Sequence, residues 1–338
     1  MRALLLLIAL PLFSELIDLD EKPQDFVLET RKIEVPEFPH AFNPSIIRWE
    51  GRLLLSFRSL PDLQDKFKSD IYLVWLDEEF NPSSQPQLLD LRPWNSSIPC
   101  RAEDARLIQI QNQLCIVYSD NAELKVTGGG FRMFIAQLEW NKDKFFAIHS
   151  ERLSDWEGED PNRREKNWVP FDYRDELFLA YSPLNNFILR PLFGTESCET
   201  VVQAKNTIDW GWGDLRGGTP GLLIGDEYLA FFHSVIKMPS VHSEGKIMPH
   251  YFMGAYTFSN SPPFNITQIS PEPIWAKNFY SGLNYERYWG SVRVVFPCGF
   301  FTDEKFIWIT YGRQDHELWI VKLDKQGLLK SLIPIGIS

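Results

Sequence analysis

Residues 42–59 read FNPSIIRWEGRLLLSFRS, a polar motif followed by two apolar runs that a polar turn separates. Apolar runs of this length, bounded by turn residues such as those of WEGR, are typical of a β-hairpin. The same order of motif, strand, turn and strand returns in EDARLIQIQNQLCIVYSDN from Glu103, KNWVPFDYRDELFLAYSP from Lys166, GGTPGLLIGDEYLAFFHS from Gly217 and VVFPCGFFTDEKFIWITYGRQD from Val294. The chain is therefore expected to consist of five related units.

Further strand-like runs follow most of these hairpins, among them DIYLVWLD, FRMFIAQLEW, YFMGAYTF and HELWIVKLD. Five repeats of about four strands each predict an all-β fold, a five-bladed β-propeller. Residues 15–338 are expected to form this propeller as a single catalytic domain. Residues 1–14, MRALLLLIALPLFS, are expected to be either a signal peptide or an N-terminal strand, which leaves the localisation open.

Composition excludes several classes of function. The net charge is −11 and no basic run occurs, so a nucleic-acid surface, which needs clustered Lys and Arg, is not expected. The four cysteines lie far apart, in no spacing typical of zinc or of a redox pair, and we expect most of them to be buried apolar residues. The apolar N-terminal run is too short to span a bilayer as a helix. A neutral or small ligand fits such an acidic chain best.

The hairpins also predict where the functional residues lie. In each hairpin the start of the first strand and the end of the second lie at the same rim, because antiparallel neighbours return to where they began. The first hairpin of a propeller blade lies nearest the axis, so five such rims surround one mouth of the central channel. The polar residues at these positions are Asn43, Arg58, Glu103, Asp104, Arg106, Asp120, Asn121, Lys166, Asn167, Ser182, Arg216, Thr219, His233, Tyr311, Arg313 and Asp315.

Two adjacent acids, Glu103 and Asp104, start the second hairpin. Adjacent side chains of a strand point to opposite faces, so they are not expected to face the same ligand. We assign Asp104 to the channel mouth, with Arg106 on the same face two residues later. Glu103 is expected to face the neighbouring blade and to hold an arginine or backbone amides.

A funnel lined by carboxylates and aromatic rings suits the cleavage of glycosidic bonds, which normally uses two acids. When phosphate is the nucleophile, it needs cations to hold its charge against the substrate and no base to activate it. The predicted mouth offers Arg58, Arg106, Lys166, Arg216 and His233. This set favours phosphorolysis, or the handling of a sugar phosphate or nucleotide sugar, over plain hydrolysis.

The repeated motifs resemble those of a known family. FNPSI followed by LSFRS, then EDARLI, EKNWVPF, LRGGTPGLL with FFHS, and VVFPCG with YGRQD are similar to the blade motifs of glycoside hydrolase family 130 and of its transferase relatives in glycosyltransferase family 108. The resemblance extends from about Phe42 to Asp324. It implies a five-bladed propeller that acts on β-mannosides with inversion, by phosphorolysis, hydrolysis or mannosyl transfer.

The same resemblance implies roles for individual residues. Asp104 matches the general acid of the family's ED-x-R motif, whose proton passes through a hydroxyl of the mannosyl unit, and Ala105 replaces the proline of the usual EDPR. Asp315 would hold mannosyl hydroxyls. The substrate- and phosphate-binding residues are expected to be Asn43, Arg58, Arg106, Lys166, Asn167, Arg216, His233, Tyr311 and Asp315. No metal or cofactor is expected, inorganic phosphate or a sugar phosphate would be a co-substrate, and a mannose-containing oligosaccharide or glycoside would be the partner.

Several alternatives stay open from the sequence alone. The protein could be a β-mannoside hydrolase, or a furanosidase on a similar propeller, which would need three acids on separate blades. It could also be a carbohydrate-binding propeller without catalysis, or a structural interaction propeller. The acceptor sugar, the linkage and the oligomeric state are not predicted.

Overall fold

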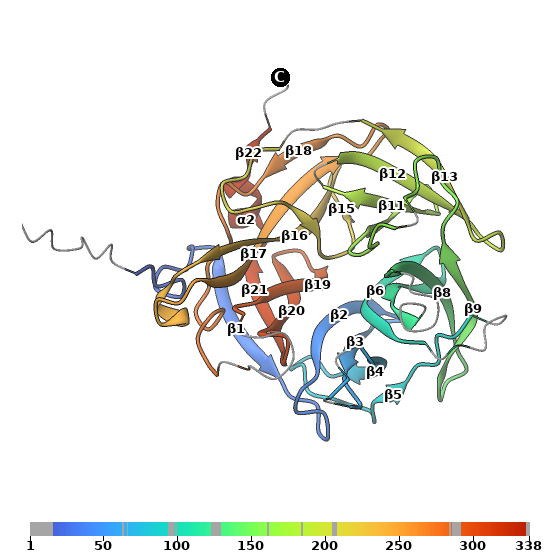
Figure 1. The fold of residues 1–338 in the computed structure, drawn as a ribbon, viewed down its shortest axis with the longest axis horizontal. Coiled ribbons are helices and arrows are strands. Elements are labelled where there is room, and N and C mark those ends of the chain that lie inside the picture. The colour runs from blue at the N-terminus through green and yellow to red at the C-terminus, as the bar shows by residue number, and fades with distance from the viewer. Residues whose placement is uncertain are drawn as a thin grey trace, which may run out of the picture.

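The computed structural model describes residues 16–335 except residues 63, 66, 94–97, 99, 123–129, 161, 184, 205–207, 284 and 286–291. The predicted signal peptide or N-terminal strand, residues 1–14, lies outside the described residues. Within them, five antiparallel sheets are arranged around a central axis as a five-bladed β-propeller (Figure 1). The predicted fold class is therefore confirmed.

Blades 1 to 3 each contain four strands in chain order. Blade 1 consists of β2 (Phe42–Trp49), β3 (Arg52–Ser59), β4 (Asp70–Leu76) and β5 (Gln87–Leu88). Blade 2 consists of β6 (Ala102–Ile110), β7 (Gln113–Asp120), β8 (Arg132–Trp140) and β9 (Phe145–Leu153). Blade 3 consists of β10 (Val169–Tyr173), β11 (Glu176–Ser182), β12 (Asn185–Leu192) and β13 (Ser197–Gln203).

The last two blades include strands from the two ends of the described chain. Blade 4 consists of β14 (Arg216–Gly217), β15 (Leu222–Ile224), β16 (Glu227–Met238), β17 (Met248–Ser259), β18 (Ile266–Ile269) and β22 (Ile333–Pro334). Blade 5 consists of β19 (Val295–Thr302), β20 (Phe306–Arg313), β21 (Glu317–Asp324) and β1 (Val27–Ile33). Because β1 pairs with β21, the first described strand closes the ring against the last blade. Two short helices, η1 (Val241–Ser243) and α2 (Lys325–Ser331), complete the described structure.

Each of the five predicted hairpins forms. β2 pairs with β3, β6 with β7, β10 with β11, β14 and β15 with β16, and β19 with β20. The first strands β2, β6 and β19 contact one another, so these hairpins lie nearest the axis, as expected. Their starts and ends are thereby brought to one mouth of the channel.

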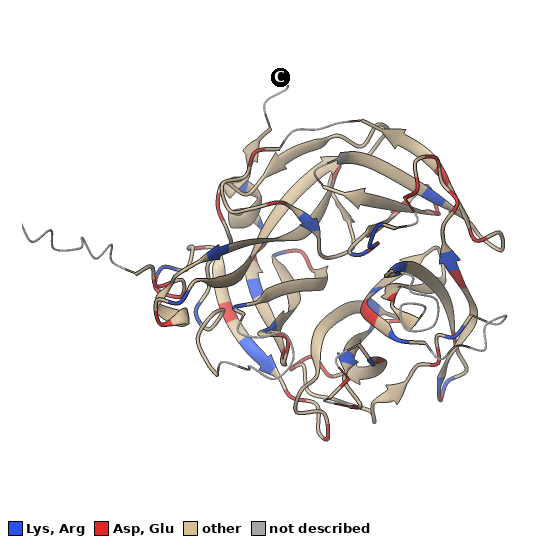
Figure 2. Ribbon diagram, in the orientation of Figure 1, with Lys and Arg blue, Asp and Glu red and all other residues tan. Residues whose placement is uncertain are grey.

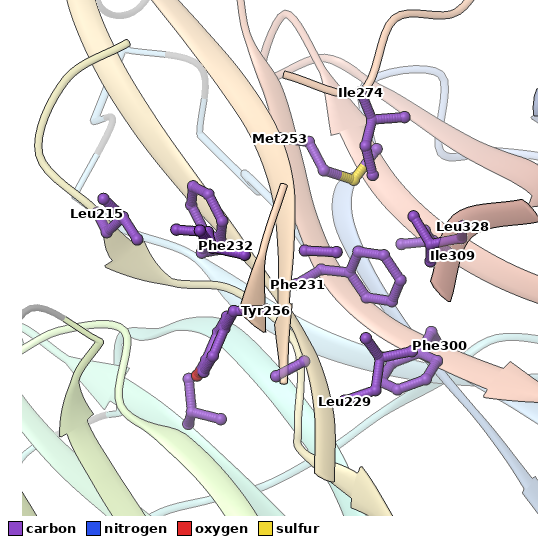
Figure 3. Close-up of a cluster of buried hydrophobic side chains, with 14 of the residues drawn as sticks. Leu215, Leu229, Phe231, Phe232, Met253, Tyr256, Ile274, Phe300, Ile309 and Leu328 are labelled. Carbon is purple, nitrogen blue, oxygen red and sulfur yellow. The ribbon is translucent and has the colours of Figure 1, made fainter. Parts of the chain in front are cut away.

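Apolar side chains fill the space between blades. Phe231 and Phe232 of β16 are fully buried, and Figure 3 shows them in a cluster with Met253 of β17 and Phe300 of β19. Burial of each such side chain stabilises the fold by about 1.5–3 kcal/mol. Strand β16 is apolar on both faces because it lies between two neighbouring layers of side chains.

The four cysteines are free, and Cys115, Cys198 and Cys298 are buried. Basic and acidic residues are both found at many places around the described ring (Figure 2). None of the described helices is both long and apolar enough to cross a membrane.

Candidate active site

A cavity of about 690 Å³ opens where the five inner hairpins start and end. All five blades contribute to its lining. Eight of the ten predicted site residues line it, namely Asn43, Arg58, Asp104, Lys166, Asn167, Arg216, His233 and Asp315. The fold therefore brings together predicted residues as far apart in sequence as Asn43 and Asp315.

Two predicted site residues do not line the cavity. Arg106 is fully buried, where its Nε donates to the Gly218 carbonyl at 2.7 Å and its Nη1 to the Asp104 carbonyl at 2.6 Å. Its Nη2 donates to Asn167 Oδ1 at 3.0 Å. Arg106 therefore supports the main chain behind the cavity and does not line it, although its positive charge still acts on Asp104.

Tyr311 is the second exception. Its side chain is fully buried in the hydrophobic core, with its ring 4.9 Å from that of Phe279. The prediction placed it at the rim because β20 ends two residues later, but a residue near a rim still points to only one face of its strand. The face that Tyr311 occupies packs against the core, so its assignment as a binding residue is withdrawn.

The two adjacent acids both line the cavity, against expectation. A β-bulge separates Glu103, which pairs with Ser119, from Arg106, which pairs with Val117. The bulge leaves Asp104 unpaired with a φ of 52°, so the alternation of side chains is interrupted there. The prediction that Glu103 faces away from the ligand is therefore wrong, although it does hold an arginine.

The left-handed backbone of Asp104 recurs at other cavity residues. Asn43, Asn167 and Asp315 have φ angles of 50°, 63° and 53°. Asn and Asp are the non-glycine residues that adopt this region most readily. Asn43 also occupies a bulge, between Phe42 and Ser45 of β2. Backbone of this kind is concentrated at functional sites, and here it turns polar side chains toward the cavity.

Arg58 connects both acids. It is 3% exposed, and its Nη2 lies 3.0 Å from Glu103 Oε1 while its Nη1 donates to Asp104 Oδ1 at 3.3 Å. Lys166 Nζ donates to Glu103 Oε2 at 2.5 Å, and Asn43 Nδ2 donates to Asp104 Oδ1 at 2.8 Å. Glu103 thus holds the two cations, while the hydrogen bonds from Asn43 and Arg58 both go to Oδ1 of Asp104.

This arrangement determines the charge of Asp104. Burial opposes its ionisation, but the positive charges of Arg58, Lys166 and Arg106, together with the hydrogen bond from Asn43, lower its pKa to about 2. Asp104 is therefore ionised at neutral pH.

Asp315 differs from Asp104. Burial and the nearby negative charge of Asp104 raise its pKa to about 7, although Arg58 and Lys166 oppose this rise. The cavity therefore contains one carboxyl that is ionised at neutral pH and one that still holds a proton over much of the physiological range. Divergent pKa values in neighbouring acids are typical of sites that transfer protons.

His233 of β16 is uncharged at neutral pH. Burial, followed by the positive charges of Arg216 and Arg106, lowers its pKa to about 3. Its Nδ1 is buried without a hydrogen-bond partner among the described residues. The expectation that His233 adds a positive charge is therefore wrong, but its neutral ring can still form hydrogen bonds with a ligand.

Several lining residues were not predicted from the sequence, among them Arg163, Arg164, Phe131 and Tyr251. The two arginines stand in the sequence RREK, which ends at Lys166. Their position next to a predicted rim residue was the signal that could have found them. Phe131 directly precedes β8 and Tyr251 lies in β17, so both belong to third strands of their blades, whereas the predicted rim positions come from the first hairpins.

Comparisons with known proteins show the fold. Neither protein-family models nor curated proteins give a match. Among solved structures, a β-1,2-mannobiose phosphorylase from Listeria innocua has 16% identity and a TM-score of 0.56, with 93% of this chain and 95% of that chain covered. The chain shares its fold.

Two further structures agree with this result. A mannose phosphorylase from Leishmania mexicana, solved with a phosphate ion, has 11% identity and a TM-score of 0.59, with 92% of each chain covered. A glycosyl hydrolase from Bacteroides ovatus has 14% identity and a TM-score of 0.59, with 85% of each chain covered. The same five-bladed propeller therefore occurs in phosphorylases and hydrolases of glycosides.

The raised pKa of Asp315 predicts a stability that depends on pH. The folded protein keeps a proton on Asp315 that the unfolded chain has released, so this group lowers the free energy of unfolding as pH rises from about 4 to about 7. Asp315→Asn removes the effect. Urea unfolding should show the variant to be about 2–4 kcal/mol more stable than the wild type at pH 8 and equally stable at pH 3.5. A difference that does not change with pH would contradict the assignment.

Proposed function

We propose that the protein is an inverting β-mannoside phosphorylase that uses the cavity as its active site and Asp104 as its general acid. The observation that carries the proposal is that one cavity contains both an acid and cations. The acid is Asp104, which accepts hydrogen bonds from Arg58 and Asn43, and cations such as Lys166 and Arg216 line the same cavity, where phosphate could bind. The shared fold with mannoside phosphorylases, one of them solved with phosphate, supports the substrate class.

Phosphate would bind near blades 3 and 4. Arg216 of β14 is exposed, forms no ion pair with a carboxylate among the described residues, and is the pairing partner of His233 across the sheet. Lys166 lies at the start of blade 3, next to blade 4. The close approach of the two blades is seen at Gly217, whose backbone lies too near the Asn167 carbonyl for Gly217 to carry a side chain. Arg216, Lys166 and the neutral ring of His233 together provide charge and hydrogen bonds for an oxyanion.

In the proposed reaction, a phosphate oxygen forms a bond to C1 of the mannosyl unit from the face opposite the leaving sugar. The bond between C1 and the glycosidic oxygen breaks, and that oxygen takes a proton supplied by the Asp104 carboxyl through a mannosyl hydroxyl. The products are α-mannose 1-phosphate and a sugar with a free hydroxyl. Asp104 ends as a carboxylate, which Arg58 and Asn43 stabilise.

Asp104 must hold a proton before this step, although the protein's own groups hold its pKa at about 2. A bound phosphate dianion offsets the positive charge of Lys166, which is one of the causes of the low value. Its negative charge therefore raises the pKa of Asp104 toward the range in which a general acid is effective. Asp315, protonated below about pH 7, donates a hydrogen bond to a mannosyl hydroxyl without adding a second negative charge.

Synthesis in the reverse direction tests this proposal. The protein is incubated with α-mannose 1-phosphate and a panel of sugars, and the release of inorganic phosphate is measured together with the appearance of β-mannosides by NMR. We expect phosphate release only when an acceptor sugar is present. Phosphate release at the same rate without an acceptor, with free mannose as the product, would identify hydrolysis instead. Binding of mannosides with no product would support a carbohydrate-binding propeller.

A further inference from the structure

Arg163 and Arg164 form a pair of cations that the proposed mechanism does not use. Both line the cavity and both are exposed, whereas Arg58, Asp104 and His233 are buried. The pair therefore lies toward the opening. If the mannosyl unit binds at Asp104, the sugar that follows it extends from the buried part of the cavity in this direction.

The main chain of this pair is held firmly. Arg132 Nη1, from β8, donates to the carbonyl oxygens of Phe131 and Arg163, each at 2.9 Å. The Glu165 amide donates to the Phe131 carbonyl at 3.0 Å. The segment before blade 3 is thus attached to blade 2, which fixes where the two arginine side chains begin.

Aromatic rings position the two guanidinium groups. Arg163 lies over the ring of Tyr181, 5.0 Å from its centre, and Arg164 lies over the ring of Phe131, 5.7 Å from its centre. The hydroxyl of Tyr181 donates to Glu165 Oε1 at 2.8 Å, so this ring is itself held in place. A guanidinium that packs on a ring by its face keeps its N–H groups directed outward for a planar anion.

These two arginines differ from Arg58 and Lys166 in their acidic partners. Arg58 and Lys166 form ion pairs with Glu103, but neither Arg163 nor Arg164 forms an ion pair with a carboxylate in the described part of the chain. Glu165, the nearest acid in sequence, is 3% exposed and accepts its hydrogen bonds from Tyr181 and Trp168. In a chain of net charge −11, two adjacent exposed arginines at a cavity opening that form no ion pair with a described carboxylate require an explanation.

We propose that Arg163 and Arg164 bind an anionic group on the sugar that follows the mannosyl unit, so that the natural substrate is a β-mannoside of an acidic sugar. This inference rests on the proposed function. The group is a carboxylate or a phosphate monoester, because both present the planar or branched oxygens that a guanidinium binds with two hydrogen bonds. Charge recognition of this kind selects the acceptor without changing the chemistry at C1.

Acceptor specificity tests the inference. Three proteins are tested: the wild type, the double variant Arg163→Gln/Arg164→Gln, and the control Arg92→Gln, which changes an exposed arginine of another region. Each is supplied with α-mannose 1-phosphate and with glucose, glucuronate or glucose 6-phosphate as the acceptor. The dissociation constants of the same three sugars and of inorganic phosphate are measured by calorimetry. We expect the wild type and the control to bind the charged sugar, either the uronate or the phosphate ester, at least tenfold more tightly than glucose. The double variant should lose this preference and keep its affinity for glucose and for inorganic phosphate within about twofold.

The outcomes separate the inference from the proposed function. Turnover of glucose with no preference for either charged sugar would overturn the inference and leave the phosphorylase proposal standing. A charge preference that depends on the two arginines, with no turnover, would support the anion site and contradict the phosphorylase proposal. Equal losses of affinity for inorganic phosphate and for charged sugars in the double variant would overturn the inference, because the arginines would then belong to the phosphate site.

Discussion

Asp104→Asn is expected to lower kcat/KM for β-mannoside cleavage by a factor of about 10²–10⁴, because general acid catalysis contributes on this scale. Asn keeps the size of the side chain, accepts the hydrogen bond from Asn43 through its carbonyl oxygen, and tolerates the φ of 52°. It has no acidic proton to give to the leaving oxygen. The variant should therefore bind mannosides and fold like the wild type, with the loss appearing in kcat.

Asp175→Asn provides the matched control for this experiment. Asp175 is exposed in the turn between β10 and β11, outside the active-site cavity, and has a similar left-handed backbone, with a φ of 66°. It should keep wild-type activity. Undiminished activity in Asp104→Asn would remove Asp104 from the mechanism, whichever nucleophile the protein uses.

Arg58→Met is expected to have the largest effect on stability. Arg58 is 3% exposed and neutralises Glu103 and Asp104, which are 2% and 6% exposed. Removing one partner from a buried ion pair leaves an uncompensated buried charge and costs about 3–5 kcal/mol. Urea unfolding at pH 7 should show this loss. The pKa of Asp104 should also rise in the variant, because Arg58 is the strongest of the groups that lower it.

Two further variants show whether charge is the cause. Arg48→Met removes an exposed arginine whose Nη atoms bind Glu78 at 2.8 Å, and a surface pair of this kind should contribute at most about 1 kcal/mol. Glu103 keeps its ion pair with Lys166 in Arg58→Met, whereas Asp104 loses its ion pair with Arg58. Adding Asp104→Asn to Arg58→Met removes this uncompensated charge and should restore part of the stability. If Arg58→Met proves no more costly than Arg48→Met, the buried network does not stabilise the fold as described.

Much of the fold was predictable from local patterns. Each inner hairpin consists of two apolar runs around a polar turn. These runs can be recognised in the sequence because both faces of the strands are buried and therefore carry apolar residues. Five repetitions of the pattern are enough to specify a propeller. The rim position of most polar site residues then follows from antiparallel pairing alone.

The finer features of the site could not be predicted in the same way. The orientation of Glu103 depends on a bulge, which changes the face of a side chain without changing the hydrophobic pattern. The neutral state of His233 depends on burial beside two arginines that lie far away in sequence. The position of Tyr311 in the core depends on which face of β20 meets its neighbour. Each of these properties arises from contacts between blades.

The sequence motif at the start of the inner hairpins does indicate the unusual backbone of the site. FNPS, EDAR and KNWV each have Asn or Asp as their second residue, at Asn43, Asp104 and Asn167, and all three adopt a left-handed backbone. In blade 4 the corresponding motif begins with Gly217 and Gly218, which do not have a left-handed backbone but approach the Asn167 and Phe231 carbonyls too closely to carry a side chain. Recurrence of Asn, Asp or Gly at one register position predicts a special backbone conformation, and here it would have warned against simple alternation.

The phosphorylase proposal is tested most directly by cleavage of a β-mannoside in the presence and absence of inorganic phosphate, followed by ¹H and ³¹P NMR. We expect the wild type to form α-mannose 1-phosphate when phosphate is supplied and to release no sugar without it, and Asp104→Asn to form no α-mannose 1-phosphate. Release of free mannose at an equal rate with and without phosphate, or formation of β-mannose 1-phosphate, would contradict the proposal.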